Sequence, residues 1–188
     1  MSKSHYIFLL IIVLVIATLT YKLSTNVEDT FSPLDPSLRH DPDYFISDFI
    51  TTMYDAEGIA NYYLKGKYME HFPDDDTFEI DALEIKYNDQ NNQSWITTSN
   101  KGLGLKNIEV LHLSGNVKIE NQPVDPDKKL ILLTDKLRID FKTRQATTDA
   151  MVKISGKSST INAIGMKIDL NKGIVKLKSQ ARGQYVPN

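Results

Sequence analysis

Side chains able to carry chemistry are sparse in this sequence. The chain contains four histidines and no cysteine. His71 precedes the acidic run Asp74–Asp76, and an imidazole beside carboxylates is a donor set that can hold a divalent cation. A carboxylate-rich turn is more often a solvated hairpin loop. We favour the loop, and no metal site is predicted.

The rest of the sequence offers no recognisable reaction centre. It has no zinc-protease, nucleophile-elbow, phosphate-loop or dinucleotide-binding motif. His112 alternates with Leu111 and Leu113 and is predicted to be an exposed or hydrogen-bonded strand residue. The formal net charge is −2 and the basic residues form no cluster, which argues against nucleic-acid binding. We therefore predict a protein that is not an enzyme and uses no cofactor.

The amino-terminal segment is a charge-free apolar run between Lys3 and Lys22. At 1.5 Å rise per residue, such a run just crosses a hydrocarbon core of roughly 30 Å. A cleaved secretory signal is the alternative, but no cleavage site of the A-x-A type follows the run. Tyr6 and Tyr21 mark its two ends, where aromatic rings anchor a membrane span. We predict an uncleaved transmembrane anchor over residues 1–23, with the remainder of the chain translocated.

The next segment, 24–43, loses hydrophobic periodicity. It carries Ser, Thr, Asn and Asp together with Pro33, Pro36 and Pro42, a composition typical of an extended spacer. The folded domain is predicted to cover 44–188. Its length is ample for one buried core.

From Tyr44 onward the pattern is strand after strand. Apolar and polar residues alternate in short runs, and these runs are Tyr62–Lys65, Leu83–Tyr87, Val110–Leu113, Val117–Ile119, Leu137–Phe141, Val152–Ile154, Met166–Leu170 and Val175–Leu177. Turn-forming residues separate them at Asp55–Gly58, Pro73–Asp76, Asn88–Asn92, Ser114–Asn116, Pro123–Asp127 and Asn171–Gly173. Trp95 begins another strand and is predicted to lie in the core. Many short strands joined by turns predict an antiparallel all-β domain.

One segment echoes another. Thr134–Phe141 matches Ala163–Leu170 in its alternation of apolar and charged residues, and Leu83–Tyr87 repeats the same alternation. Stacked copies would build a sheet with one long apolar face. The alternative is that alternation simply marks half-buried strands, and the sequence leaves both interpretations open.

Several short motifs also occur in an order characteristic of one protein family. They are, in chain order, Tyr54–Leu64 (Y-x-x-E-G-x-x-x-Y-x-L), Ser94–Thr98 (similar to a W-x-[VI] strand), Leu111–Val117 (L-x-L-x-G-x-V), Leu133–Asp135 (a T-[DT] strand entry), Gly165-Met166 and Gly183–Tyr185. With the amino-terminal anchor, they resemble the LptC family, the membrane-anchored periplasmic component of the lipopolysaccharide export machinery. The resemblance covers nearly the whole chain.

This resemblance implies a twisted, partly open β-jelly roll of the OstA-like type behind a single transmembrane helix. It implies an inner-membrane, single-pass protein whose carboxy-terminal domain lies in the periplasm. Such a protein accepts lipopolysaccharide from an inner-membrane ABC transporter and passes it to a soluble periplasmic carrier of like fold. The anchor and the strand Tyr44–Tyr54 are expected to contact the permease subunits, and the last strand, through Tyr185, is expected to contact the carrier.

A hydrophobic groove can shield acyl chains without a specific pocket, because burial stabilises each methylene by about 0.8 kcal/mol. The residues predicted to face the interior and to include the lipid-contacting set are Phe49, Met53, Leu64, Ile80, Leu111, Leu113, Val117, Leu137, Ile139, Met166, Ile168, Val175 and Tyr185. Those predicted to serve turns, close strand approach or partner edges are Gly58, Gly165, Tyr54 and Gly183.

The alternative function is a membrane-tethered β-sandwich adaptor that binds protein partners and carries no lipid. The two differ in their interiors. A carrier needs an interior open to lipid at both ends, whereas an adaptor has a closed, fully packed core.

Overall fold

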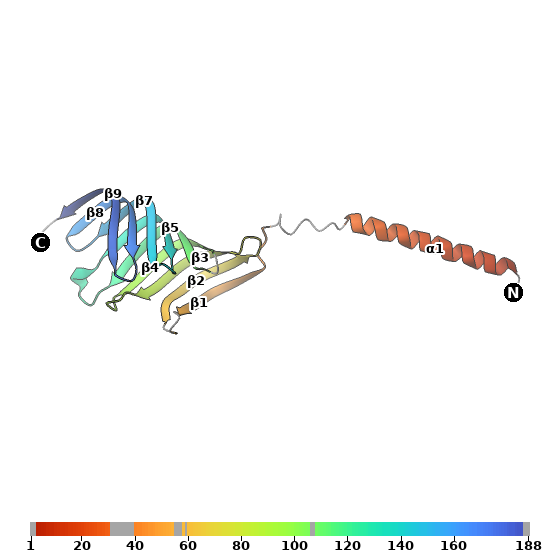
Figure 1. Cartoon of the computed structure of the whole chain (residues 1–188), viewed down its shortest axis with the longest axis horizontal. Coiled ribbons are helices and arrows are strands. Elements are labelled where there is room, and N and C mark those ends of the chain that lie inside the picture. The colour runs from red at the N-terminus through yellow and green to blue at the C-terminus, as the bar shows by residue number, and fades with distance from the viewer. Residues whose placement is uncertain (1–2, 31–39, 55–57, 59, 106–107, 186–188) are drawn as a thin grey trace. The chain divides into compact units, whose positions relative to one another are not determined.

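The structure is a computed structural model that describes residues 3–30, 40–54, 58, 60–105 and 108–185 (Figure 1). The chain divides into two compact units, Met1–His40 and Asp41–Asn188. We describe each unit by itself.

The first unit contains helix α1, Lys3–Thr30. This segment has neither Gly nor Pro, so nothing in it breaks the helical hydrogen-bond pattern. The helix continues through Ser24–Thr30, and the extended conformation predicted there is wrong: Ser, Thr and Asn cost a growing helix only about 0.7 kcal/mol or less each. The part 31–39 of the predicted spacer lies outside the described residues. Within the helical residues that the structure describes, no stretch is both long and apolar enough to cross a membrane.

The second unit is one open sheet of nine antiparallel strands in sequence order (Figure 1). The strands are β1 (Tyr44–Tyr54), β2 (Ala60–Phe72), β3 (Thr77–Asn88), β4 (Ser94–Leu105), β5 (Val110–Gln122), β6 (Ile131–Asp140), β7 (Gln145–Ser155), β8 (Ser159–Asp169) and β9 (Ile174–Tyr185). The 3-10 helix η2, Pro126–Lys128, lies between β5 and β6. The all-β prediction is confirmed. β1 and β9 form the two edges of the sheet.

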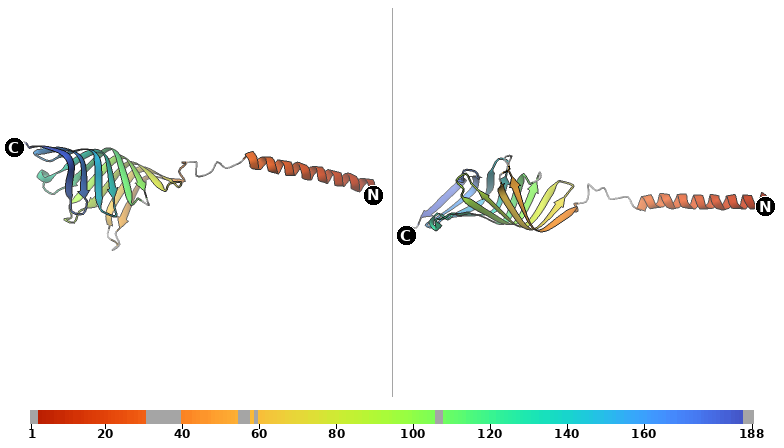
Figure 2. Two further views of the ribbon diagram at one scale, coloured as in Figure 1. Left: turned by 45° about the horizontal axis from the view of Figure 1, so that its top comes forward. Right: turned by 90° about the horizontal axis from the view of Figure 1, so that it is seen from below.

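Most strands are longer than the predicted runs because they continue through irregular positions near their middles. In β3, Ile80 and Leu83 are both buried although three positions apart, and Ala82 between them has φ 50°. β6 has the same irregular spacing: Thr134 and Leu137 are both buried although three positions apart, and the register of β6 with β7 shifts between Thr134 and Arg138. Such bulges bend strands and increase their twist. Figure 2 shows the resulting curvature of the sheet around its own inner face.

One predicted turn is instead a bulge. Ser114–Asn116 lies inside β5, where Gly115 has φ 74° and Asn116 has φ 51°. The register of β5 with β6 shifts between Ser114 and Val117. The residue types that make a tight turn also make a bulge, and here the chain continues in the same strand.

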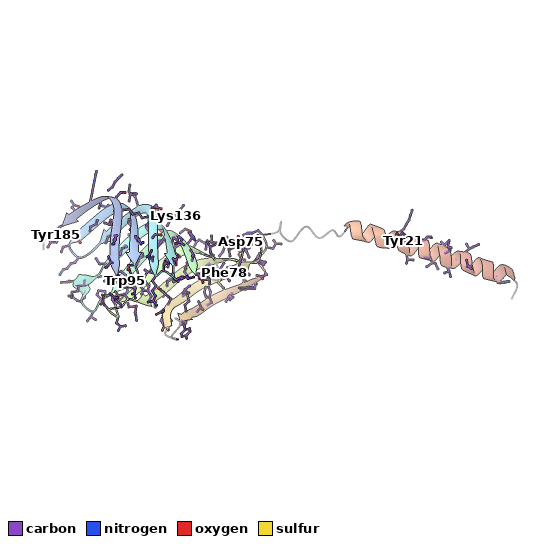
Figure 3. The ribbon with its side chains drawn as sticks, viewed as in Figure 1. Tyr21, Asp75, Phe78, Trp95, Lys136 and Tyr185 are labelled. Carbon is purple, nitrogen blue, oxygen red and sulfur yellow. The ribbon has the colours of Figure 1, made fainter. Side chains whose placement is uncertain are left out.

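The core is a single cluster of buried apolar residues from β2 to β8 and the turns between them. Trp95 belongs to it at 7% exposed, as predicted. Phe78 and Trp95 come from adjacent strands and lie toward opposite ends of that strand pair (Figure 3). The apolar interior therefore extends along the strands as well as across them.

The two echoing segments have matching burial. In Thr134–Phe141 the buried residues are at the first, fourth, sixth and eighth positions. Ala163–Leu170 is buried at the same four positions and also at the third, Gly165. The segments form the later parts of β6 and β8, together with the first residue of each following turn. The shared feature is therefore a bulged, half-buried strand.

Candidate functional site

The centre of the interior is lined by predicted lipid-contacting residues from β2 to β8. Nine of them are at most 4% exposed: Leu64, Ile80, Leu111, Leu113, Val117, Leu137, Ile139, Met166 and Ile168. They belong to one continuous cluster, in which Leu111 lies opposite Ile139 and Leu113 opposite Leu137 in the β5–β6 register. The interior is packed side chain against side chain in this conformation.

The predicted residues on the two edge strands are less buried. Phe49 and Met53 of β1 and Val175 of β9 are half-buried and pack against the core cluster. Leu177 behaves in the same way. Tyr185 is not part of this set: it is 72% exposed at the end of β9 (Figure 3). Burial thus decreases toward both edges of the sheet, so the apolar surface reaches solvent there.

Phe49 has a specific neighbour. It lies opposite Gly66 in the β1–β2 register, and a Cβ at Gly66 would lie 2.5 Å from Phe49 Cε1 and 2.9 Å from Ile80 Cγ2. The ring of Phe49 therefore packs over Gly66. An aromatic ring on one strand that covers a glycine of the neighbouring strand stabilises the pairing of the two strands. Phe49 joins β1 to the core at that point.

The four residues predicted for turns and edges lie in different settings. Gly58 is exposed with φ 79°, and Tyr54 is 66% exposed at the end of β1, where the register shifts. Gly183 lies opposite Ile161 near the end of β9. Gly165 has φ 73° inside β8, and a Cβ there would lie 2.8 Å from Lys178 Cδ. This position needs glycine both for its backbone conformation and for the approach of β9.

Further interior residues were absent from the predicted set. They are Tyr62, Met69, Phe78, Leu83, Ile85, Tyr87, Ile119, Leu132, Phe141, Ala146, Val152, Ala163 and Leu170, all buried in the same cluster. Several of them share the alternation that identified the predicted residues. Those inside the predicted runs, such as Ile85 and Phe141, could have been named from the alternation alone. Those outside the runs, such as Phe78, Leu132 and Ala163, would have been found by extending the runs to the full lengths of the strands.

The edge strand β1 exposes apolar side chains. Phe45 is 66% exposed, Ile50 71% and Tyr54 66%. The ring of Phe45 stacks on Tyr68 of β2 with centroids 5.8 Å apart. An edge strand with apolar side chains and free backbone groups is suited to pairing with a strand of another protein.

A depression of about 650 Å³ lies where the bulges of neighbouring strands adjoin, and the core residues Val117 and Val152 form part of its lining. It is lined by residues of β4 to β8, among them the exposed Leu133 and Met151 beside Asn100, Asn116 and Asp135. Its polar rim distinguishes it from the apolar interior.

His71 joins the start of β1 to the β2–β3 hairpin. Its Nδ1 lies 2.7 Å from Asp43 Oδ1 and its Nε2 lies 3.2 Å from Asp76 Oδ1. The imidazole stacks on Tyr44 with centroids 4.8 Å apart and lies 4.7 Å from the ring of Phe78. Two carboxylates facing both ring nitrogens favour the doubly protonated ring. The hydrogen bond to Asp43, followed by that to Asp76, raises the pKa of His71.

A pH-dependent contribution to stability follows from this arrangement. Because the pKa is higher in the folded state than in the unfolded state, the contribution is complete below the unfolded value near 6.5 and is lost as pH rises through the raised folded value. We expect His71→Phe, which keeps a ring between Tyr44 and Phe78, to destabilise the protein clearly at pH 6 and less at pH 9. Urea unfolding at both pH values tests this. Equal destabilisation at the two pH values would contradict it.

Comparison with known proteins adds to this geometry. The family model described as "Lipopolysaccharide-assembly, LptC-related" matches residues 9–186. The chain belongs to the LptC family. It is similar to the lipopolysaccharide export system protein LptC of Haemophilus influenzae, with 25% identity over 162 residues, 77% of this chain and 77% of the relative. It is also similar to LptC of Escherichia coli K12, with 23% identity over 149 residues, 78% of this chain and 76% of the relative.

Among solved structures, the chain matches LptH of Pseudomonas aeruginosa, described as the LptA homologous periplasmic component of the conserved lipopolysaccharide transport device. The TM-score is 0.49 at 13% identity, over 74% of this chain and 96% of that chain. Within the chain, the LptC family match takes in most of α1 and every strand of the sheet. Both edge strands and the whole interior therefore lie inside the family region.

Proposed function

We propose that this LptC family member takes part in lipopolysaccharide export. It accepts lipopolysaccharide extracted by an inner-membrane ABC transporter, shields the acyl chains in its interior and passes them to a soluble periplasmic carrier of like fold. The observation that carries the proposal is an apolar interior that is continuous across the sheet and becomes exposed toward both unpaired edges. Burial of about 0.8 kcal/mol per methylene makes such a surface a sufficient site for acyl chains.

The lipid-contacting residues in this proposal include Phe49 and Met53 at one edge and Val175 at the other. Between them lie the nine predicted residues that are buried in the centre: Leu64, Ile80, Leu111, Leu113, Val117, Leu137, Ile139, Met166 and Ile168. The sheet acts as a partly open β-jelly roll. Its edge strand β1, with Phe45, Ile50 and Tyr54 exposed, supports pairing with a periplasmic part of the permease subunits. β9 supports pairing with the soluble carrier, because edge strands of like folds can extend one another's sheets.

The proposal also includes placement at the inner membrane. The apolar run between Lys3 and Lys22 serves as the anchor, and the sheet lies in the periplasm. The family description and the charge-free composition of that run support this arrangement. Between the anchor and β1, residues 24–43 connect the two parts.

Photocrosslinking at neighbouring positions of β6 tests the transport function. Ile139 is 3% exposed in the interior, whereas Arg138 faces outward and its Nη2 contacts Asp140 Oδ2 at 3.3 Å. A photoreactive residue at Ile139, in cells producing lipopolysaccharide, is expected to form a lipid adduct under ultraviolet light. The same residue at Arg138 is expected to form none, because its side chain lies on the other face of the same strand.

The second candidate function is a tethered adaptor that binds only proteins. The packing of the interior favours it, since Ile80, Leu111 and Met166 are 0% exposed. The same crosslinking experiment separates the two functions. If no lipid adduct forms at Ile139, at other interior positions or at Arg138, the result would support the adaptor.

A further inference from the structure

Turns from opposite rims of the sheet meet one another. In an antiparallel meander, successive turns alternate between the two rims, so the β3–β4 turn lies on one rim and the β6–β7 and β8–β9 turns on the other. Yet the backbone N–H of Gln90, in the β3–β4 turn, donates to the carbonyl of Asn171, in the β8–β9 turn, at 2.9 Å. The sheet must therefore roll up until the rim of its first strands reaches the opposite rim of its last strands.

We call this junction the seam and define it as residues 88–93, 141–144 and 170–173. On one side of the seam, two bonds tie the β6–β7 turn to the β8–β9 turn: Arg144 Nη1 donates to Asn171 Oδ1 at 3.3 Å, and the N–H of Leu170 donates to the carbonyl of Arg144 at 2.9 Å. Gly173 has φ 65°, and a Cβ there would lie 2.9 Å from Asp89 Oδ2. The β3–β4 and β8–β9 turns thus approach so closely that a side chain at Gly173 would meet the Asp89 carboxylate.

The seam also covers one end of the interior. Tyr62 of β2 lies edge-on to Phe141 of the β6–β7 turn with centroids 4.8 Å apart, and 5.8 Å from the ring of Tyr87. Burial raises the pKa of both tyrosines, so their hydroxyls remain protonated. An aromatic layer beneath the hydrogen-bonded turns therefore separates the apolar cluster from water along this line.

Acyl chains cannot occupy the centre of the interior while it is packed as described. Dense cores have no free volume for a chain of methylenes, and the central residues are 0–4% exposed. Space must come from separation of the first strands from the last. Neighbouring strands are held by ladders of backbone hydrogen bonds both within the first half of the sheet (β1–β4) and within the last half (β6–β9), and β5 links the two halves in the same way. At the seam, by contrast, the two halves meet through turns and side chains.

We propose that the seam is a gate: it opens to admit acyl chains between the two halves of the sheet and closes when the interior packs against itself. This rests on the proposed transport function. The bulges, such as those at Ala82 and Gly115, give the strands places to bend as the seam separates. A gate of this kind lets the protein hide its apolar surface from water between loads.

A reversible crosslink across the seam tests the gate. The chain has no cysteine, so Gln90→Cys with Asn171→Cys introduces a single possible disulfide between residues already joined by a backbone hydrogen bond. The matched control is Lys153→Cys with Asn162→Cys, exposed partners on the adjacent strands β7 and β8. That disulfide lies within one half and leaves the seam free.

Binding of purified, fluorescently labelled lipopolysaccharide to the full chain is measured by polarisation, oxidised and reduced. We expect oxidation of the seam variant to weaken binding at least tenfold and reduction to restore it, with the control unaffected by oxidation. Equal binding by the oxidised and reduced seam variant, with the disulfide verified by mass, would overturn the gate and leave the transport function standing. Absence of binding by the unsubstituted chain would overturn both.

Hydrogen exchange of the unsubstituted chain gives a second readout that does not depend on the variants. The amide of Gln90 is bonded across the seam, whereas the amide of Lys128 is bonded to Asp125 within its own turn at 3.0 Å. Lipopolysaccharide is expected to speed exchange at Gln90 and leave Lys128 unchanged. No change at Gln90 when lipid is bound would contradict an opening seam.

Discussion

Ile80→Ala is expected to lower the free energy of unfolding by about 2–5 kcal/mol, the range for large-to-small substitutions in packed cores. Ile80 is 0% exposed in β3, and its side chain lies beside Gly66 and Gly102 of the two flanking strands. The neighbouring strands cannot fill the cavity without shifting, so the loss should lie toward the upper part of that range. Urea unfolding followed by the fluorescence of Trp95, the chain's one tryptophan, measures it.

The control is Ile50→Ala in β1. It removes the same atoms from a side chain that is 71% exposed, and surface substitutions usually change stability by about 0.5 kcal/mol or less. Similar losses for the two variants would mean that Ile80 is not part of a packed core. That result would favour an interior that is already open, and with it a carrier that needs no gate.

The strands of this protein were largely visible in the sequence because most of them bury one face. A half-buried strand alternates apolar and polar residues, and Leu83–Tyr87 shows that alternation directly. The strand lengths were not visible. Ile80 and Leu83 belong to one strand, but their spacing of three breaks the alternation, and the sequence pattern treats the break as an end.

Bulges and turns use the same residues, which explains the error at Ser114–Asn116. A glycine with a positive φ followed by Asn suits either structure. The choice is made by the flanking strands β4 and β6, which pair with β5 on both sides of the bulge. The pairing residues of β4 and β6 lie outside the short segment around Ser114–Asn116, so the local sequence pattern cannot distinguish the bulge from a turn.

The interior residues followed from alternation, whereas the seam did not. Gln90 and Asn171 were recognisable as turn residues, but their hydrogen bond depends on how far the sheet rolls up. The roll depends on the summed twist and bulges of the intervening strands. His71 lies beside Asp74–Asp76 in the sequence, and its Nε2 does contact Asp76. Its second partner, Asp43, lies 28 positions earlier and could not be inferred from the local sequence.

Asp89→Ala is expected to cost about 2–4 kcal/mol, because it leaves the buried indole N–H of Trp95 and two partly buried backbone N–H groups without an acceptor. Asp89 is 9% exposed, and its Oδ1 accepts from the N–H groups of Asn91 at 2.9 Å and Gln93 at 3.0 Å. Its Oδ2 accepts from Trp95 Nε1 at 3.3 Å. The carboxylate thus shapes the β3–β4 turn, holds the core tryptophan and faces the β8–β9 turn. Urea unfolding measures the loss, and a shift in the native fluorescence of Trp95 reports the broken indole bond.

Asp125→Ala is the matched control. Its carboxylate also accepts from a backbone N–H in a turn, that of Asp127 at 3.0 Å, but this site is exposed. Water replaces an exposed acceptor, so the expected loss is about 1 kcal/mol. Because Asp89 supports one side of the seam, its substitution should also speed exchange at the Gln90 amide, and Asp125→Ala should not. A large loss of stability with unchanged exchange at Gln90 would show that the β3–β4 turn is stabilised independently of the seam.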